Sequence, residues 1–166
     1  LVSGGGWSTA KGPEGDSWSA FLHERNALFN FIRDEAIEGV VLFSGDTHSG
    51  ELNVIPWSDQ GGYDLYDLSS SPLAQEPDDD WYFRNPEMRL RLPYDLGQNF
   101  GWVEFDFRGE EPTLTFNLVG VEGEPVWDPL VLRPADLVNG RRTWPEKQSA
   151  KAARWMEQFH AGWKDR

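Results

Sequence analysis

Apolar residues occur along the chain with two periods, and each period predicts a type of element. From Ser17 onward they recur at steps of three and four, which is the spacing of one face of an α-helix. Asp16 or Ser17 can cap the start of this helix, and Glu38-Gly39 is its predicted end. The apolar positions of this helix are Trp18, Phe21, Leu22, Leu28, Phe29 and Ile32. The short β-branched and aromatic run at 40–44 predicts a buried strand directly after the helix. Together they predict an αβ unit whose helix lies on a sheet.

Alternating or apolar runs bounded by turn residues predict a series of further strands. The predicted strands are 51–57, 63–68, 100–107, 113–121 and 126–132. The polar and glycine-rich segment 58–62 predicts a hairpin between the first two of these strands, and the next two read as a second antiparallel hairpin. On one side of 113–121 lie Leu114, Phe116 and Leu118, while in 100–107 the residues Phe105 and Phe107 share the face of Val103.

Two segments of the second half differ from this strand pattern. Residues 74–98 form a long, proline-interrupted insertion loop that contains a triple aspartate. The triple aspartate lacks the glycine and distal glutamate of a calcium loop and is typical of a solvated acidic turn. The aromatic content of this loop suggests a lid.

The sequence Thr143-Trp144-Pro145-Glu146 has the form of a capping box and predicts a terminal helix over 143–164, docked on the body of the protein or free to bind a partner. Its apolar stripe is Ala152, Trp155, Met156, Phe159 and Trp163.

Composition limits the classes of partner. The chain has 166 residues, enough for one domain of mixed α/β (α+β) class or for a piece of something larger. A formal charge of −13 argues against a basic face for nucleic acid or anionic membranes, and fits either cationic ligands such as divalent metals or a surface that only confers solubility. No apolar run reaches the length of a membrane span. With no cysteine, any metal must be bound by oxygen and nitrogen ligands.

The candidate ligands of that kind are Asp46 and His48, which follow the apolar run at 40–44. Residues just past the carboxyl end of a buried strand lie at the edge where open α/β sheets bind ligands. Two residues that are two positions apart can converge on one ion, and a carboxylate with an imidazole suits a hard or borderline metal. The alternative is that Asp46 caps a turn and His48 is an ordinary loop histidine.

Several short motifs together resemble the alkaline phosphatase D (PhoD-like) family of metallophosphoesterases. They are Asp16-Ser17-Trp18-Ser19-Ala20-Phe21 with Glu24-Arg25, the run at 40–49 that contains Gly45-Asp46-Thr47-His48, the segment 66–73, and Asn99-Phe100-Gly101. The motifs follow the order of the family and extend from residue 16 to residue 107.

The resemblance implies a fold, an activity and a site. The fold would be half of a calcineurin-like β-sandwich flanked by helices, with residues 1–166 forming the carboxyl-terminal portion of a single metallophosphatase domain. The activity would be hydrolysis of phosphate monoesters or diesters by two metal ions, expected to be iron and calcium. Asp46 and His48 match the family's Gly-Asp-x-His metal motif. Extracytoplasmic or secreted location is suggested by the resemblance only.

One pair of ligands is fewer than this chemistry needs. A two-metal centre requires about six or more protein ligands. The family's first metal-binding motifs precede its Asp-x-Trp helix, so the resemblance implies a missing amino-terminal half, as a second chain or as upstream sequence. The alternatives are a non-catalytic β-rich binding module and a degenerate scaffold. Asn53, Asp64 and Asp67 could reach the pocket or serve in turns and strands, and Arg25 could contact phosphate, although a buried ion pair is favoured.

Overall fold

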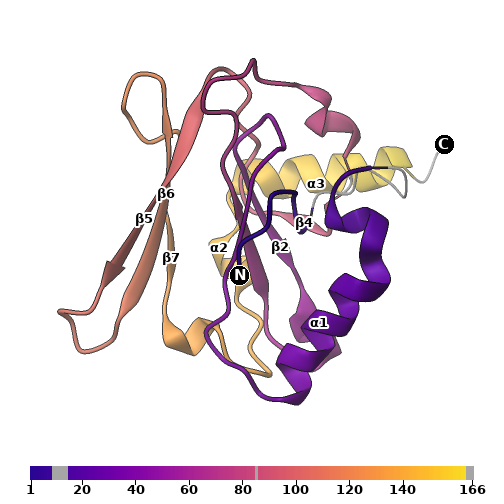
Figure 1. Ribbon diagram of the computed structural model, residues 1–166, viewed down its shortest axis with the longest axis vertical. Coiled ribbons are helices and arrows are strands. Elements are labelled where there is room, and N and C mark those ends of the chain that lie inside the picture. The colour runs from indigo at the N-terminus through magenta and orange to yellow at the C-terminus, as the bar shows by residue number, and fades with distance from the viewer. Residues whose placement is uncertain (9–14, 85, 164–166) are drawn as a thin grey trace.

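Two β-sheets and their flanking helices make up the structure, a computed structural model that describes residues 1–8, 15–84 and 86–163, apart from the side chains of 82, 83 and 160–163. The first sheet has the strand order β1-β3-β2-β4 and the second the order β5-β6-β7. Figure 1 shows the helices α1 and α3 on the side of the first sheet that faces away from the second. The mixed α+β class is as predicted.

The first sheet contains the elements that surround the Asp46–His48 loop. Its strands are β1 (Leu42–Ser44), β2 (Glu51–Ile55), β3 (Leu65–Ser69) and the short edge strand β4 (Met88–Arg89). β1 is parallel to β3, whereas β2 is antiparallel to both β3 and β4. Every residue of β2 and β3 is buried, as expected for strands covered on both faces. The predicted hairpin is confirmed, with the 3-10 helix η2 (Trp57–Gln60) between its strands.

The beginning of the chain extends this sheet. Val2 pairs in parallel with Phe43 of β1. The Phe43 N–H donates to the carbonyl of Leu1 at 2.8 Å, and the Ser3 N–H donates to the carbonyl of Phe43 at 2.9 Å. The first residues therefore lie beside β1 as an additional edge of the sheet.

The predicted first helix is present but begins and ends differently. It consists of a 3-10 turn, η1 (Trp18–Phe21), followed by α1 (Leu22–Asp34). The N-caps are Ser17 for η1 and Phe21 for α1, and neither side chain makes a capping hydrogen bond. The predicted end at Glu38-Gly39 is wrong, since Ala36 adopts a left-handed φ of 50° that stops the helix after Asp34.

The second sheet comprises β5 (Asn99–Asp106), β6 (Thr113–Gly120) and β7 (Leu130–Leu132), all antiparallel. Leu114, Phe116 and Leu118 of β6 are buried, as the alternation predicted. At the end of β5, Phe105 and Phe107 stack on each other, which agrees with the predicted shared face, and they are 57% and 75% exposed. They lie at the outer end of the hairpin, beyond the part of the sheet that faces the core.

Two glycines lie in close contact with side chains of β6. A Cβ at Gly50 would lie 2.2 Å from Leu118 Cδ2, and one at Gly101 would lie 2.7 Å from Phe116 Cε2. A side chain at either position would collide with β6 residues of the core. Gly50, which follows the Asp46–His48 loop, therefore joins the candidate site directly to the packing between the sheets.

The terminal helix is divided rather than continuous over 143–164. The structure has α2 (Trp144–Lys147) and α3 (Ala150–Trp163), separated at Gln148 by an extended ψ of 131°. The predicted capping box is absent: Thr143 makes no capping bond, and its hydroxyl lies 2.7 Å from the hydroxyl of Tyr66. Residue 164 and the side chain of Trp163 lie outside the described part of the chain.

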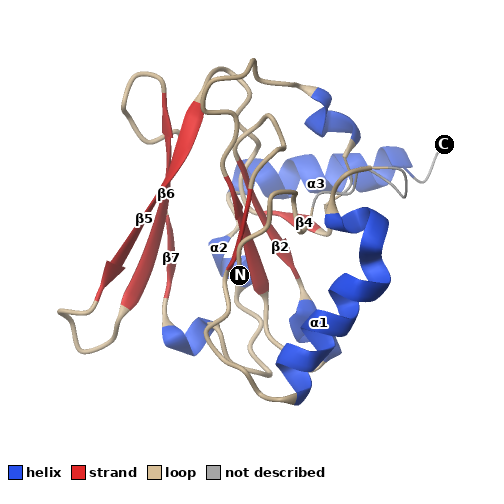
Figure 2. Cartoon of the chain, viewed as in Figure 1, coloured by secondary structure: helices blue, strands red, loops and turns tan. Residues whose placement is uncertain are grey.

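α3 docks on the body of the protein, as predicted. Ala152 and Met156 are buried, and Trp155 lies over the guanidinium of Arg89, 5.1 Å from the ring centroid. The ring of Trp81 also contacts that guanidinium, with its centroid 5.3 Å from the guanidinium carbon and 5.8 Å from the ring centroid of Trp155. Figure 2 shows α3 crossing beside the first sheet.

Among the described residues, no helix is both long enough and apolar enough to cross a membrane, in agreement with the expectation from the sequence.

Candidate functional site

The loop between β1 and β2 carries both predicted metal ligands. It follows the carboxyl end of β1, where the sequence placed it. Asp46 and His48 both have left-handed backbone conformations, with φ of 60° and 53°. Between them Thr47 is buried, and its hydroxyl donates to the carbonyl of Ser49 at 2.6 Å. The buried Thr47 side chain thus anchors a tight turn that presents its two neighbours, with Asp46 exposed and His48 partly buried.

Hydrogen bonds with two other segments hold the backbone of His48. Its N–H donates to Ser71 Oγ at 3.2 Å, and its carbonyl accepts the N–H of Asp78 at 2.8 Å. Ser71 is in turn held by the side-chain amide of Asn99, which accepts the Ser71 N–H at 3.1 Å and donates to its carbonyl at 2.7 Å. The Asn99 motif of the second sheet therefore helps to position the loop without reaching a ligand position itself.

Asp46 and His48 line the same pocket. It has a volume of about 140 Å³ and is also lined by Asp16, Asp78, Asp80 and Arg84. The sequence did not place these four residues at the site. Asp78 and Asp80 belong to the 74–98 segment, which contains the 3-10 helix η3 (Asp80–Phe83) as well as β4. The triple aspartate is therefore next to the candidate ligands, and the only indication of this in the sequence was its acidity.

Arg84 connects this pocket to a buried ion network. Its Nη1 donates to the carbonyl of Thr47 at 2.8 Å and to Glu51 Oε1 at 2.9 Å, while Nη2 pairs with Asp80. Glu51 is fully buried and also pairs with Arg89 at 3.0 Å. Burial opposes ionisation of Glu51, but the charges of Arg89 and Arg84 outweigh it and lower the pKa of this carboxyl. Arg84 therefore ties the Asp46–His48 loop to a buried carboxylate of β2.

The side chains that line this pocket include types that bind metal ions in proteins. Carboxylate oxygens and an imidazole nitrogen are ligands for calcium, iron and similar ions. In the described part of the chain, however, no three histidine or acidic side chains are grouped closely enough to hold an ion. Asp46 and His48 are thus the pair that the turn presents, and the pocket adds further carboxylates around them.

The weaker candidates of the sequence have structural partners. Asp67 is buried and accepts the N–H of Trp7 at 3.0 Å and the N–H of Ser8 at 2.9 Å. Burial raises the pKa of its carboxyl, although hydrogen bonds from Ser44 and Ser8 oppose this rise. Arg25 pairs with Glu87 at 2.7 Å, which is the structural role that the sequence favoured over a contact with phosphate.

Two further candidates also act within the fold. Asp64 Oδ2 accepts the N–H groups of Thr143 and Trp144 at 2.6 and 2.9 Å, so it caps α2 from a distance. Asn53 is buried in β2, where its Nδ2 donates to Glu51 at 2.8 Å. Neither residue lines the pocket of Asp46 and His48.

Comparison of the chain with protein-family models, curated proteins and solved structures found no match. A proposal for its function therefore depends on the residues, their geometry and the resemblance of the short motifs.

Proposed function

We propose that this protein takes part in metal-dependent hydrolysis of phosphate esters and contributes one side of a two-metal centre of the alkaline phosphatase D type, within a calcineurin-like sandwich. The proposal joins the motif resemblance to one structural observation. Asp46 and His48 are presented by a single tight turn at the carboxyl end of β1, and both line one acidic pocket. Iron with calcium is the metal pair that the resemblance suggests.

The charge of the pocket supports a role for cations. Four of its lining residues are aspartates, and the guanidinium of Arg84 is engaged with Asp80, Glu51 and a backbone carbonyl. A phosphate ester would be repelled by these carboxylates unless positive ions lay between them. Bound ions would polarise the ester and make a bound water more acidic.

The protein's own residues have three roles in this proposal. Asp46 and His48 would hold an ion through oxygen and nitrogen. Thr47 and Ser71 fix the backbone of the turn, which keeps the two ligands in place before an ion arrives. Arg84 holds the carbonyl of Thr47 against Glu51, so it is a positioning residue. The remaining ligands would come from the amino-terminal half that the resemblance implies.

Metal titration tests the site itself. Calcium and ferrous iron would be titrated into the chain and into an Asp46→Asn/His48→Ala double variant, with binding followed by calorimetry. We expect the double variant to lose at least about tenfold in affinity. An Asp34→Asn/His23→Ala variant is the matched control, because these side chains are 61% and 80% exposed on the first helix. Equal affinities in all three proteins would contradict the proposal and favour a non-catalytic module.

Turnover tests whether the chain supplies only one side of the centre. We expect no hydrolysis of bis(p-nitrophenyl) phosphate by residues 1–166 with calcium and iron, and hydrolysis by a longer polypeptide that includes upstream sequence. Asp46→Asn in the longer polypeptide should lower kcat by about a hundredfold or more. Robust turnover by residues 1–166 that disappears in Asp46→Ala would instead mean that the site is complete.

A further inference from the structure

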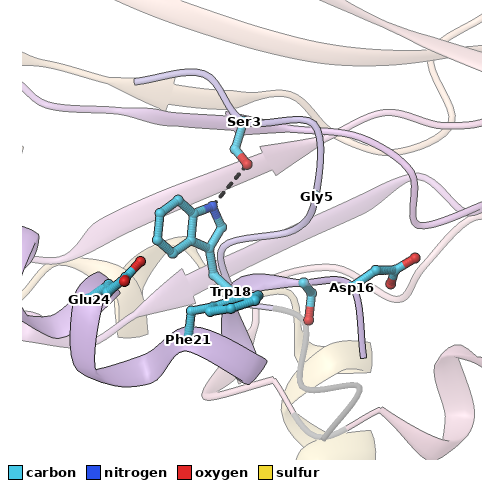
Figure 3. Close-up of a pocket in the computed structure, with 7 residues that line it drawn as sticks. Ser3, Gly5, Asp16, Trp18, Phe21 and Glu24 are labelled. Carbon is cyan, nitrogen blue, oxygen red and sulfur yellow. Dashed lines mark hydrogen bonds between the residues drawn. The ribbon is translucent and has the colours of Figure 1, made fainter. Parts of the chain in front are cut away.

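A second cavity, of about 300 Å³, lies between the beginning of the chain and the start of the first helix. Its walls include the rings of Trp18 and Phe21 and the carboxylates of Asp16 and Glu24 (Figure 3). Its other lining residues are Ser3, Gly5 and Ser17, so the lining contains two acids and no basic side chain. This combination differs from the pocket of Asp46, where carboxylates surround a histidine and an arginine.

The aromatic wall of the cavity is rigid. Trp18 stacks on Trp7 with ring centroids 4.7 Å apart and an angle of 4° between the planes. Its indole N–H donates to Ser3 Oγ at 2.9 Å, the bond drawn in Figure 3. Trp7 is itself buried, and its backbone N–H donates to Asp67. Because both ends of the stack are anchored, a ligand would not have to order this wall on binding.

Phe21 and Glu24 form the exposed side of the cavity. Phe21 is 50% exposed, and the Glu24 side chain is 64% exposed. They are three positions apart at the beginning of the first helix, a spacing that places two side chains on one face. Figure 3 shows Glu24 on the indole side of the cavity and the Asp16 carboxylate pointing away from Trp18. His23 Nε2 lies 3.7 Å from Glu24 Oε1, so a ligand cation would share this carboxylate with His23.

These walls suit an organic cation. The faces of aromatic rings attract ammonium groups, and nearby carboxylates add charge attraction. An inorganic ion would gain little from the aromatic surface, whereas a neutral apolar group would gain nothing from the two acids. A substituted ammonium uses both features.

The position of Asp16 relates this cavity to the candidate metal pocket. Asp16 lines both, so the two cavities meet at this residue. We infer that the cavity binds a substituted ammonium group carried by the alcohol portion of the phosphate ester, with the phosphate directed to the pocket of Asp46 and His48. This assignment of the substrate rests on the proposed hydrolytic function, whereas binding of the cation to the cavity does not.

Binding is tested with choline and its neutral isostere 3,3-dimethylbutan-1-ol, each titrated into residues 1–166 without metal. We expect choline to bind roughly fivefold more tightly than the isostere, because only choline carries the charge. Glu24→Gln and Phe21→Leu should each remove most of this difference. Glu35→Gln and Phe31→Leu are matched controls from the same helical segment, where both residues are exposed, and they should leave the difference unchanged. Equal affinity for the two ligands, or unchanged discrimination in Glu24→Gln and Phe21→Leu, would overturn the inference.

A turnover experiment tests the substrate assignment on the longer polypeptide. The two substrates are p-nitrophenyl phosphorylcholine and p-nitrophenyl 3,3-dimethylbutyl phosphate. Glu24→Gln should raise KM severalfold for the choline ester alone, and an unchanged ratio of the two KM values would overturn the assignment. Asp46→Asn should abolish turnover of both esters while leaving choline binding intact. If neither ester is hydrolysed, the proposed function and the substrate assignment both fail, but binding of choline to the cavity stands.

Discussion

Glu51 and Arg89 form an ion pair, with 3.0 Å between Oε2 and Nη1, in which both side chains are completely buried. Arg84 binds the other oxygen of Glu51, and Arg84 also holds the loop that presents Asp46 and His48. The two strands that carry this pair, β2 and β4, lie at one edge of the first sheet. Stability and the geometry of the candidate site therefore depend on the same carboxylate.

Replacing Glu51 by Gln should destabilise the protein strongly. The substitution keeps the shape of the side chain but leaves Arg89 buried without a counter-charge and Arg84 with Asp80 alone. Losing one partner of a buried pair costs about 3–5 kcal/mol. The measurement is the free energy of unfolding in urea. The control is Arg142→Gln, because Arg142 pairs with Asp59 and both side chains are about half exposed. This substitution should change the free energy of unfolding by less than about 1 kcal/mol. Similar losses in the two variants would contradict the prediction.

Acid should weaken the fold through the same residue. Although burial opposes ionisation, the neighbouring guanidinium groups lower the pKa of Glu51 from its ordinary value of 4.5. A carboxyl whose pKa is lower in the folded state contributes stability above its unfolded pKa and loses that contribution as the pH falls through its folded pKa. Unfolding free energies measured from about pH 6 to about pH 3 should therefore decrease with acid more steeply in the wild type than in Glu51→Gln. Parallel pH profiles would contradict this.

A distant cap on α2 provides another test. Asp64 accepts the N–H groups of Thr143 and Trp144 and also the hydroxyl of Ser58. Asp64→Ala should lower the free energy of unfolding by about 2–3 kcal/mol, because a helix cap is lost and three partly buried donors lose their acceptor. Thr143→Ser keeps the hydroxyl that bonds Tyr66 and should cost less than about 0.5 kcal/mol. A loss in Asp64→Ala no larger than that in Thr143→Ser would contradict the capping role of Asp64.

The predictions that succeeded concern periodicity. Alternation identified the hairpin β5–β6 because a half-buried strand imposes a period of two on its side chains. The polar, glycine-rich turn between two strand candidates identified the hairpin β2–β3. The apolar run ending at Ser44 located the Asp46–His48 loop, since the residue after a buried strand emerges at the sheet edge. These patterns are local, and the sequence displays them directly.

The predictions that failed concern pairings between distant residues. Thr143 has the form of a cap, but Asp64 takes that role from the other side of the fold. Asp16 and Asp80 line the pocket of Asp46 only because η3 and the start of the first helix come together in space. Charged residues within strands, such as Glu51, reveal their partners only after the sheet is assembled.

The backbone conformation of Asp46 predicts that a substitution there can raise stability while weakening the proposed metal binding. Asp46 has a φ of 60°, a conformation that costs residues with a side chain about 1 kcal/mol and costs glycine nothing. Asp46→Gly should therefore raise the free energy of unfolding by about 0.5–1 kcal/mol while lowering the affinity for calcium and iron. Ala36→Gly is the matched control, because Ala36 has a φ of 50° at the end of α1, away from the pocket. It should give a similar gain in stability with unchanged metal affinity. A loss of stability in Asp46→Gly, with the gain preserved in Ala36→Gly, would mean that the aspartate side chain stabilises the turn and is not held there for binding an ion.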